Sequence, residues 1–330
     1  MSTALVDSFG RVHTDLRVSL TDRCNLRCRY CMPEEGLPWL QRQEVLTTDE
    51  IVRLVGIGAQ RLGIRSIRLT GGEPLLRRDL VEVVGRLAEI EPSLELAMTT
   101  NGIGLARSAE SLKQAGLGRV NISLDTLRPE RFAEITRRDR LADVLAGITA
   151  AKAAHLDPVK VNVVLMRGVN DDEIVDLARF AVDSGCQVRF IEAMPLDAQG
   201  AWSRETVVTA DEILERLESH FALDQLDGDP SAPAHVWSIS GTDARVGIVA
   251  SVTRAFCSNC NRVRLTADGQ LRNCLFAATE TDLRTLLRTG ADDDAIEQAW
   301  RTCIAGKARG HGINDVTFQQ PARPMSAIGG

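Results

Sequence analysis

The feature that most constrains the fold is an alternation of strand-like and helix-like patterns over the first 196 residues. Six short stretches rich in Val, Ile and Leu fit strands, and helical patterns lie between them. The strand patterns cover residues 16–20, 64–69, 94–98, 119–124, 159–165 and 188–191. Strands separated by helices predict parallel β-α units with right-handed crossovers. Six units are fewer than the eight of a closed barrel, so we predict an α/β fold with an incomplete (β/α)6 barrel.

Several helix starts carry cap signals. Thr47 to Glu50 has the capping-box pattern, and Thr209 begins another capped helix. Asn170 is predicted to cap a helix that reaches about residue 184, and residues 281–288 are predicted to be helical. After about residue 196 the regular alternation ends. We therefore divide the chain into a partial barrel, residues 1–196, and a C-terminal extension, residues 197–330.

Polar or glycine-rich residues follow the predicted strands. In barrel enzymes, the rim at the carboxyl ends of the strands carries the active site. Loops are often polar in any protein, which explains a polar residue after any one strand. It explains poorly why polar residues follow almost every strand. The residues concerned are a cysteine-rich loop after the first strand, then Gly71, Gly72, Thr99, Ser123 to Asp125, Glu192 and Met194.

The cysteine-rich loop contains Cys24, Cys28 and Cys31 in a C-x3-C-x2-C pattern. Soft thiolate ligands favour zinc or an iron–sulfur cluster. Three ligands are one too few for a closed structural zinc site, whereas a four-iron cluster held by three cysteines keeps one iron open. A zinc loop with a distant fourth ligand stays as the alternative.

A second cysteine triplet, Cys257, Cys260 and Cys274, lies in the extension. A structural zinc site with a fourth ligand such as His235 is one interpretation. Arg262 and Arg264 are two residues apart, so on a strand they point to one face beside the cysteines. Guanidinium pairs suit phosphate recognition, which favours an anion-binding site next to this triplet.

Composition and charge exclude several other classes. The net charge of −6 and 4% aromatic residues argue against a nucleic-acid surface. The N-terminus lacks a secretory pattern, and no apolar run has membrane-helix length, so we expect a cytoplasmic protein without membrane contact. The eight cysteines are then expected to be thiols for metal binding or catalysis rather than disulfides.

These motifs together resemble a known family. C-x3-C-x2-C with an aromatic residue before its last cysteine is similar to the radical S-adenosylmethionine (SAM) enzymes. From about residue 15 to its end, the chain resembles the GTP 3′,8-cyclase family of molybdenum cofactor biosynthesis. The further motifs that carry this resemblance are GGEPLLR at 71–77, CNR-x-R-x-T-x-DG-x-L-x-x-C at 260–274 and the terminal Gly-Gly. The family pattern shows no missing ligand position here.

The resemblance implies two [4Fe-4S] clusters, one on each cysteine triplet, with SAM on the first and the guanine of GTP at the second. It assigns SAM contacts to Tyr30, Gly72, Ser123 and Met194. It assigns GTP contacts to Arg17, Arg68, Thr99, Lys160, Arg262, Val263 and Arg264. Independently, a long cation on a barrel strand, such as Arg17 or Lys160, needs an anionic partner, which is either a ligand or a buried carboxylate.

The implied reaction begins with a radical that removes the 3′ hydrogen of the GTP ribose, after which the ribose carbon attacks C8 of guanine. An electron and a proton then complete the product, 3′,8-cyclo-7,8-dihydro-GTP. The implied partners are an electron donor such as flavodoxin or ferredoxin and a downstream cyclic pyranopterin monophosphate synthase, and a homodimer is compatible. The terminal Gly-Gly tail resembles a family tail that reaches the active site. A peptide-modifying radical SAM enzyme and an iron–sulfur electron carrier are the alternatives.

Overall fold

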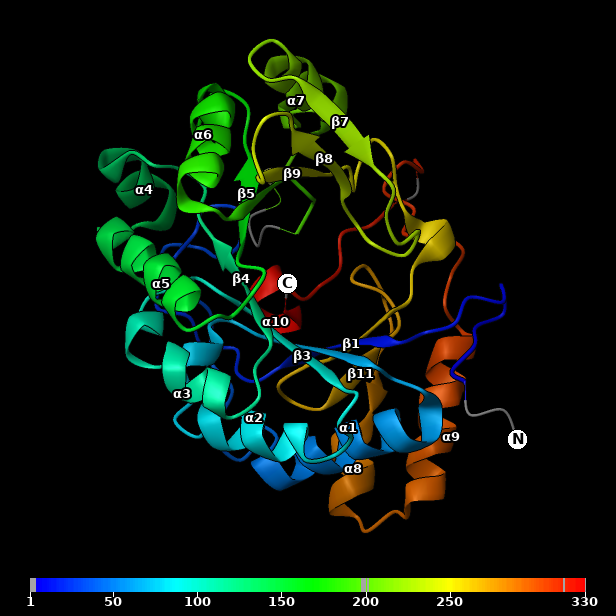
Figure 1. The fold of residues 1–330 in the computed structure, drawn as a ribbon. Helices are drawn as coiled ribbons and strands as arrows, with labels where there is room; N and C mark the ends of the chain where they lie inside the picture. The colour runs from blue at the N-terminus through cyan, green and yellow to red at the C-terminus, as the bar shows by residue number, and fades with distance from the viewer. Residues whose placement is uncertain (1–3, 197–199, 201, 317, 330) are drawn as a thin grey trace.

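Six parallel strands form the centre of the molecule. The structure is a computed structural model that describes residues 4–196, 200, 202–316 and 318–329 (Figure 1). Each central strand pairs in parallel with the next, as predicted. These strands are β1 (Asp15–Ser19), β2 (Ser66–Thr70), β3 (Glu95–Thr100), β4 (Arg119–Ser123), β5 (Lys160–Leu165) and β6 (Gln187–Glu192).

The C-terminal segment extends this sheet at both edges. β9 (Arg245–Val249) joins β6 in parallel, and β10 (Arg262–Leu265) joins β1 in parallel. The outermost strands are antiparallel: β8 (His235–Ile239) and β7 (Leu223–Leu226) lie beyond β9, and β11 (Gln270–Arg272) and β12 (Thr281–Asp282) lie beyond β10. The sheet ends at β12 and β7 and is not closed, which confirms the incomplete barrel. Strands from before and after residue 196 belong to the same sheet. The division into two domains at that residue stays a prediction.

Helices cover the outside of the sheet, except for the C-terminal helix α10 (Met325–Ile328), which lies inside the barrel (Figure 1). Both capping boxes are present: Thr47 and Glu50 exchange hydrogen bonds before α1, and Thr209 and Glu212 do so before α7. The described residues contain no helix long and apolar enough to span a bilayer. The helices are α1 (Thr48–Leu62), α2 (Leu80–Ala88), α3 (Ala109–Gln114), α4 (Pro129–Thr136), α5 (Leu141–Ala153), α6 (Ile174–Ser184), α7 (Ala210–Glu218), α8 (Leu283–Arg288), α9 (Asp293–Ala305) and α10 (Met325–Ile328).

Two local predictions differ from the structure in detail. Asn170 is at the N-cap position of the 3-10 helix Asp171–Glu173, which leads into α6, but its side chain makes no capping hydrogen bond. Its Oδ1 accepts from Met166 N at 2.8 Å, and its amide donates to Asp125 O and Val164 O, at 2.8 and 2.9 Å. The helix predicted at residues 281–288 is present as α8 (Leu283–Arg288), and only its first two residues differ, because Thr281–Asp282 pairs with β11 as β12.

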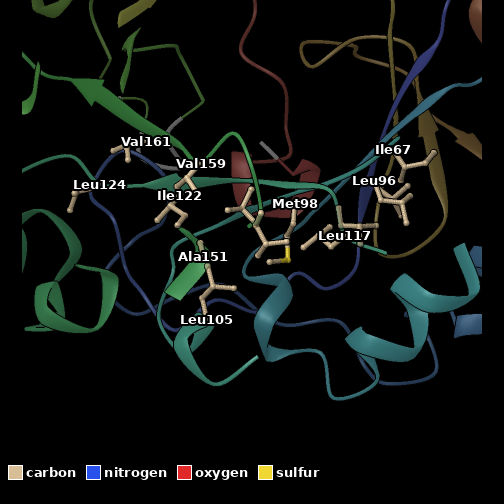
Figure 2. Close-up of a cluster of buried hydrophobic side chains, with 14 of the residues drawn as sticks. Ile67, Leu96, Met98, Leu105, Leu117, Ile122, Leu124, Ala151, Val159 and Val161 are labelled. Atoms are coloured by element: carbon tan, nitrogen blue, oxygen red, sulfur yellow. The ribbon is translucent and has the colours of Figure 1, made fainter. Parts of the chain in front are cut away.

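The hydrophobic core lies between the sheet and its helices. Side chains of successive strand residues point to opposite faces, so each strand contributes alternate residues to this core. Figure 2 shows a part of it, in which Ile67, Leu96, Met98 and Ile122 are 0–3% exposed. The opposite face of each strand points into the barrel, and it carries the polar residues considered next.

Candidate active site

The inner face of the barrel carries a row of cations at the same level. Arg17 on β1 is in register with Arg264 on β10 on one side and with Arg68 on β2 on the other. Residues in parallel register share a face, so these three guanidinium groups all point inward. Lys160 on β5 is on this face too, because it is in register with Asn121 of β4. The structure therefore brings together four of the residues predicted to bind GTP.

Sequence reasoning missed further inward-facing cations. Arg119 begins β4 in register with Ala97, the neighbour of Arg68, and Arg189 of β6 is in register with Asn162, two residues after Lys160. The signal was present in the sequence, since Arg189 interrupts an apolar strand as Arg17 does. The inward cations are Arg17, Arg68, Arg119, Lys160, Arg189, Arg262 and Arg264.

Little negative charge balances these cations. The carboxylate of Asp15 lies 3.8 Å from Arg17 Nε and 3.9 Å from an Arg68 Nη, and the exposed carboxylate of Glu95 lies 3.4 Å from an Arg119 Nη. Among the described residues these are the only carboxylates that pair with the inward cations. The Nε atoms of Arg17 and Arg68 are buried without a hydrogen-bond partner. The sequence left open that buried carboxylates, and not a ligand, balance these cations. The carboxylates present balance only a small part of the positive charge.

The pKa values reflect the same imbalance. Burial, followed by the charges of Arg189, Arg119, Arg68 and Arg245, lowers the pKa of Lys160 to about 7. Burial and neighbouring Arg68 likewise lower the pKa of Arg17 to about 9. Cations that repel one another in a partly desolvated space favour a polyanionic ligand, because its charge relieves both costs. The site is suited to a group such as a triphosphate.

The two other predicted GTP residues differ in kind. Thr99 is on the inner face of β3, in register with Asn121, whose side-chain amide donates to Thr99 Oγ1 at 3.3 Å. Val263 is fully buried and is part of the hydrophobic core, on the face of β10 opposite to Arg262 and Arg264. Only the peptide group of Val263 is therefore available to a ligand in the barrel.

The first cysteine triplet is in the loop after β1, and the Gly71-Gly72-Glu73 segment packs directly against that loop. Gly72 N donates to Thr21 O and Glu73 N to Arg23 O, both at 2.7 Å. A Cβ atom on Gly72 would lie 2.5 Å from Asp22 O and closer still to Arg23 O. Gly72 is thus required for the approach of two backbones, whether or not it also contacts a ligand.

Glu73 ties this segment to the next strand. Its carboxylate accepts hydrogen bonds from Thr100 Oγ1 at 2.6 Å, Asn101 N at 2.7 Å and Leu75 N at 3.0 Å. Burial raises its pKa to about 7, and these hydrogen bonds act against that rise. The side-chain amide of Asn101 in turn lies 4.0 Å from Cys24 Sγ. Three loops at the carboxyl end of the sheet are therefore held as one unit.

The three thiols of this loop fit a cluster of the predicted kind. They form no disulfide. Burial raises the pKa of Cys24 to about 11 and that of Cys31 to about 12, and neighbouring thiols of the triplet raise the pKa of Cys28 and Cys31 further. Desolvated sulfurs that would repel one another as thiolates are stabilised by a cationic metal centre.

A cavity of about 210 Å³ lies beside the first triplet. Two predicted SAM residues, Tyr30 and Met194, line it, whereas Gly72 and Ser123 do not. Tyr30 donates from its hydroxyl to Asp125 at 2.8 Å, and burial raises the pKa of Asp125 to about 6. The cavity is also lined by Met166, Trp202 and Met325, which sequence reasoning did not identify. An apolar cavity with a few polar groups is typical of a small-molecule site.

The second triplet lies at the opposite end of the strands. Cys24 follows the carboxyl end of β1, while Cys260 precedes β10, which runs parallel to β1. The five residues of β1 thus separate the two triplets by a strand length of roughly 16 Å. His235, the fourth zinc ligand suggested from sequence, is exposed on β8, with its ring 6.5 Å from that of Trp237. The inward cations lie between the two cysteine groups.

Cations surround this second triplet. Lys307 Nζ lies 3.5 Å and an Arg262 Nη 3.8 Å from Cys260 Sγ. Although burial alone would raise it, the charges of Lys307 and Arg262 lower the pKa of Cys260. Arg262 also donates to Ser231 O at 2.5 Å, so this predicted GTP residue is directed partly toward the cysteine group. Thiols with a stabilised anionic form are suited to ligate iron.

The C-terminal tail enters the barrel (Figure 1). Ser19 Oγ donates to Ile328 O at 2.8 Å, and the Arg264 guanidinium donates to Gly329 O. Upstream, Arg323 pairs with both carboxylate oxygens of Asp268, at 3.0 and 2.8 Å. The described part of the tail is therefore anchored at the site and is not a frayed terminus.

Comparisons with known proteins identify the class to which this fold and site belong. Residues 18–181 match the radical SAM superfamily, and residues 186–313 match the family described as Molybdenum Cofactor Synthesis C. The crystal structure of SuiB from Streptococcus suis has the same fold, with a TM-score of 0.62 over 95% of this chain and 76% of that chain, at 12% identity. The chain is a radical SAM protein, and the incomplete barrel is the fold of that class.

Relatives of high identity define the family more closely. The GTP 3′,8-cyclase of Streptomyces coelicolor is 59% identical over 328 residues, which cover 99% of this chain and 96% of the relative. That of Mycobacterium sp. strain KMS is 60% identical, covering 99% and 93%. GTP 3′,8-cyclase 2 of Mycobacterium tuberculosis H37Rv is 57% identical, covering 99% and 92%. This chain belongs to the GTP 3′,8-cyclase family.

Proposed function

We propose that this enzyme cyclises GTP to 3′,8-cyclo-7,8-dihydro-GTP by radical SAM chemistry, the first step of molybdenum cofactor biosynthesis. The observation that carries the proposal is the set of inward cations between two cysteine triplets, among which the described residues place only the carboxylates of Asp15 and Glu95 in ion pairs. A triphosphate supplies the missing negative charge, and membership of the cyclase family supports the reaction.

The first triplet, Cys24, Cys28 and Cys31, would hold a [4Fe-4S] cluster whose open iron binds SAM. When bound, these groups supply one-electron cleavage of SAM and thereby a radical that can remove hydrogen from the ribose. The chain's part is to hold SAM and exclude water. The proposed SAM contacts of Tyr30 and Met194 are supported by the cavity that both residues line. The proposed SAM contact of Gly72 is supported by its hydrogen bond to the cysteine loop. Ser123 is supported by its place at the inward-facing end of β4.

The triphosphate would be bound by Arg17, Arg68 and Lys160, and we add Arg189 because it faces the same space. Charge-assisted contacts of this kind fix the phosphate oxygens and so orient the attached ribose. Thr99 is near enough to this row to contact the nucleotide, and Val263 would act through its peptide group. The fixed position of GTP brings C3′ toward the radical source and limits its motion relative to C8.

The second triplet, Cys257, Cys260 and Cys274, would hold a second [4Fe-4S] cluster that contacts the guanine, with Arg262 and Arg264 beside it. The position of this triplet at the far end of the barrel supports separate roles for the two clusters. One GTP molecule can then extend between the two cysteine groups, with its phosphates on the inward cations and its base at the second triplet. The anchored tail, through the contact of Arg264 with Gly329, closes the same space.

The partners follow from the reaction. The enzyme needs a low-potential electron donor such as flavodoxin or ferredoxin, and its product is the substrate of a cyclic pyranopterin monophosphate synthase. We propose a cytoplasmic location, because free thiols in this number are typical of a reducing compartment. We also propose a homodimer, which sedimentation of the reconstituted enzyme would test.

An anaerobic assay tests the function. Reconstituted enzyme is incubated with dithionite, SAM and GTP, and the products are separated by chromatography. We expect 5′-deoxyadenosine and 3′,8-cyclo-7,8-dihydro-GTP in equal amounts, and neither product without SAM. Formation of 5′-deoxyadenosine with GTP left unchanged would exclude GTP as the substrate. Replacement of GTP by ATP is the control, since it keeps the triphosphate and changes the base.

A further inference from the structure

Lys307 is a buried ammonium group beside the second cysteine triplet. It is 4% exposed. Its Nζ lies 2.8 Å from Arg262 O, 3.5 Å from His13 Nδ1 and 3.5 Å from Cys260 Sγ. An ammonium group has three hydrogens to donate, so these three acceptors use all of them. Lys307 is thus held in one position, with one donor directed at a cysteine sulfur.

The positive charge of Lys307 has no carboxylate partner among the described residues. A buried cation without an anion is costly, and in this structure the anionic groups near it are sulfurs. The geometry therefore pairs this ammonium with the sulfur of Cys260.

Lys307 is supported from behind by the N-terminal arm. His13 is fully buried, and its Nε2 lies 3.0 Å from Asp7 Oδ2. Burial and the charge of Lys307 lower the pKa of His13 to about 4, so the ring is neutral at pH 7. A neutral ring that donates from Nε2 to Asp7 keeps Nδ1 free to accept from Lys307. His13 is therefore the tautomer with its hydrogen on Nε2.

Asp7 is fixed in turn by Arg11. The Arg11 Nε donates to Asp7 Oδ2 at 2.6 Å, and one Nη donates to Cys257 O at 2.7 Å and to Arg309 O at 2.9 Å. The arm is therefore tied to the cysteine segment and to the residues that follow Lys307. Asp7, His13 and Lys307 form a continuous hydrogen-bonded series that ends at Cys260.

We propose that Lys307, oriented by His13 and Asp7, is a positioning residue of the second iron–sulfur cluster and raises its reduction potential. The proposal rests on the second cluster proposed above. Reduction adds a negative charge to the cluster, and a fixed cation that donates to one of its sulfur ligands stabilises that charge. Loss of the cation makes the cluster harder to reduce.

The test is a redox titration followed by electron paramagnetic resonance. The full chain is reconstituted with Cys24, Cys28 and Cys31 each changed to Ser, so that only the second cluster contributes. Lys307→Met removes the charge and the donor, whereas Lys307→Gln removes the charge and keeps a donor. Lys113→Met is the matched control, because Lys113 is exposed and donates to His155 O, away from both triplets.

We expect a lower midpoint potential in both Lys307 variants and an unchanged potential in Lys113→Met. His13→Ala should shift the potential in the same direction by less, because Lys307 keeps its charge but loses its orientation. An unchanged potential in Lys307→Gln, with normal iron content, overturns the inference and leaves the proposed function intact. A parent protein without a second cluster overturns both, and iron analysis shows this before any lysine is changed.

Discussion

At the scale of single residues, the main finding is a set of buried cations without matching carboxylates. Arg17 and Arg68 share Asp15 at nearly 4 Å, and Lys160 forms no ion pair among the described residues. A protein retains such an arrangement at a cost to its stability, because each charge loses hydration and repels its neighbours. The arrangement is explained by an anionic substrate that supplies the missing charge.

Arg17→Ala should weaken GTP binding while SAM cleavage persists. The variant loses a charge-assisted contact worth roughly 1.5–3 kcal/mol, which corresponds to about a tenfold to hundredfold increase in Kd. Calorimetry with GTP measures the change. Arg65→Ala, at an exposed position just before β2, is the control and should bind GTP as the parent does. Equal affinities in both variants would mean that the triphosphate lies elsewhere.

GTP affinity should fall as the pH rises above about 7, because of Lys160. Its pKa in the free enzyme is about 7, and a bound triphosphate favours the protonated form, so the pKa is higher in the complex. Binding then takes up a proton between these two pKa values. Lys160→Arg stays charged and should show a flatter profile of Kd against pH from 7 to 9. Profiles of the same slope would exclude Lys160 as the titrating contact.

At the scale of elements, the site depends on how closely two loops approach each other. The Gly71-Gly72-Glu73 segment bonds through its backbone to residues 21–23, just before the first cysteine. Glu73 then fixes both to the loop after β3. The cysteine loop is therefore positioned mainly by backbone contacts and by one buried carboxylate.

Gly72→Ala should displace the cysteine loop. Its Cβ would clash with Asp22 O and Arg23 O, and backbone atoms cannot rotate away as a side chain does. We expect a lower melting temperature and loss of SAM cleavage. Gly85→Ala is the control: a Cβ there meets nothing within 4 Å, and within helix α2 alanine stabilises by up to about 1 kcal/mol. A Gly72→Ala enzyme that cleaves SAM at the parental rate would contradict this view of the loop.

At the scale of the whole molecule, the parallel pairing of β10 with β1 separates two cysteine triplets by a strand length. β10 beside β1 places Cys260 at the end of the barrel opposite to Cys24. The tail, held by Arg323 and Arg264, lies between them. One chamber can thus receive two metal centres with independent supports.

Cys274→Ala should separate the roles of the two centres. Iron should fall from about eight to about four per chain, because one of the two proposed four-iron clusters is lost. SAM cleavage to 5′-deoxyadenosine should persist, since Cys24, Cys28 and Cys31 remain, whereas GTP cyclisation should be nearly abolished. Circular dichroism checks the fold, because loss of a metal centre can unfold its surroundings. A folded variant that cyclises GTP normally would show that the second centre is structural.

Much of this protein could be predicted from local sequence. The six β-α units, both capping boxes and the two cysteine triplets are visible because strand and helix periodicity, caps and ligand spacing each lie within one short segment. The inward direction of Arg17 and Lys160 also followed from a cation on an otherwise apolar strand. The family resemblance then supplied the roles of these residues, which the chain alone does not reveal.

Only the tertiary structure decided which distant segments meet. Local patterns do not tell that β9 and β10 extend the sheet at both edges, because strand register between distant segments depends on the whole sheet. The same reason applies to Asn170, whose side-chain amide donates to Asp125 O and Val164 O and whose side chain makes no capping hydrogen bond. It applies most to Lys307 and His13, which are 294 residues apart in sequence and 3.5 Å apart beside Cys260.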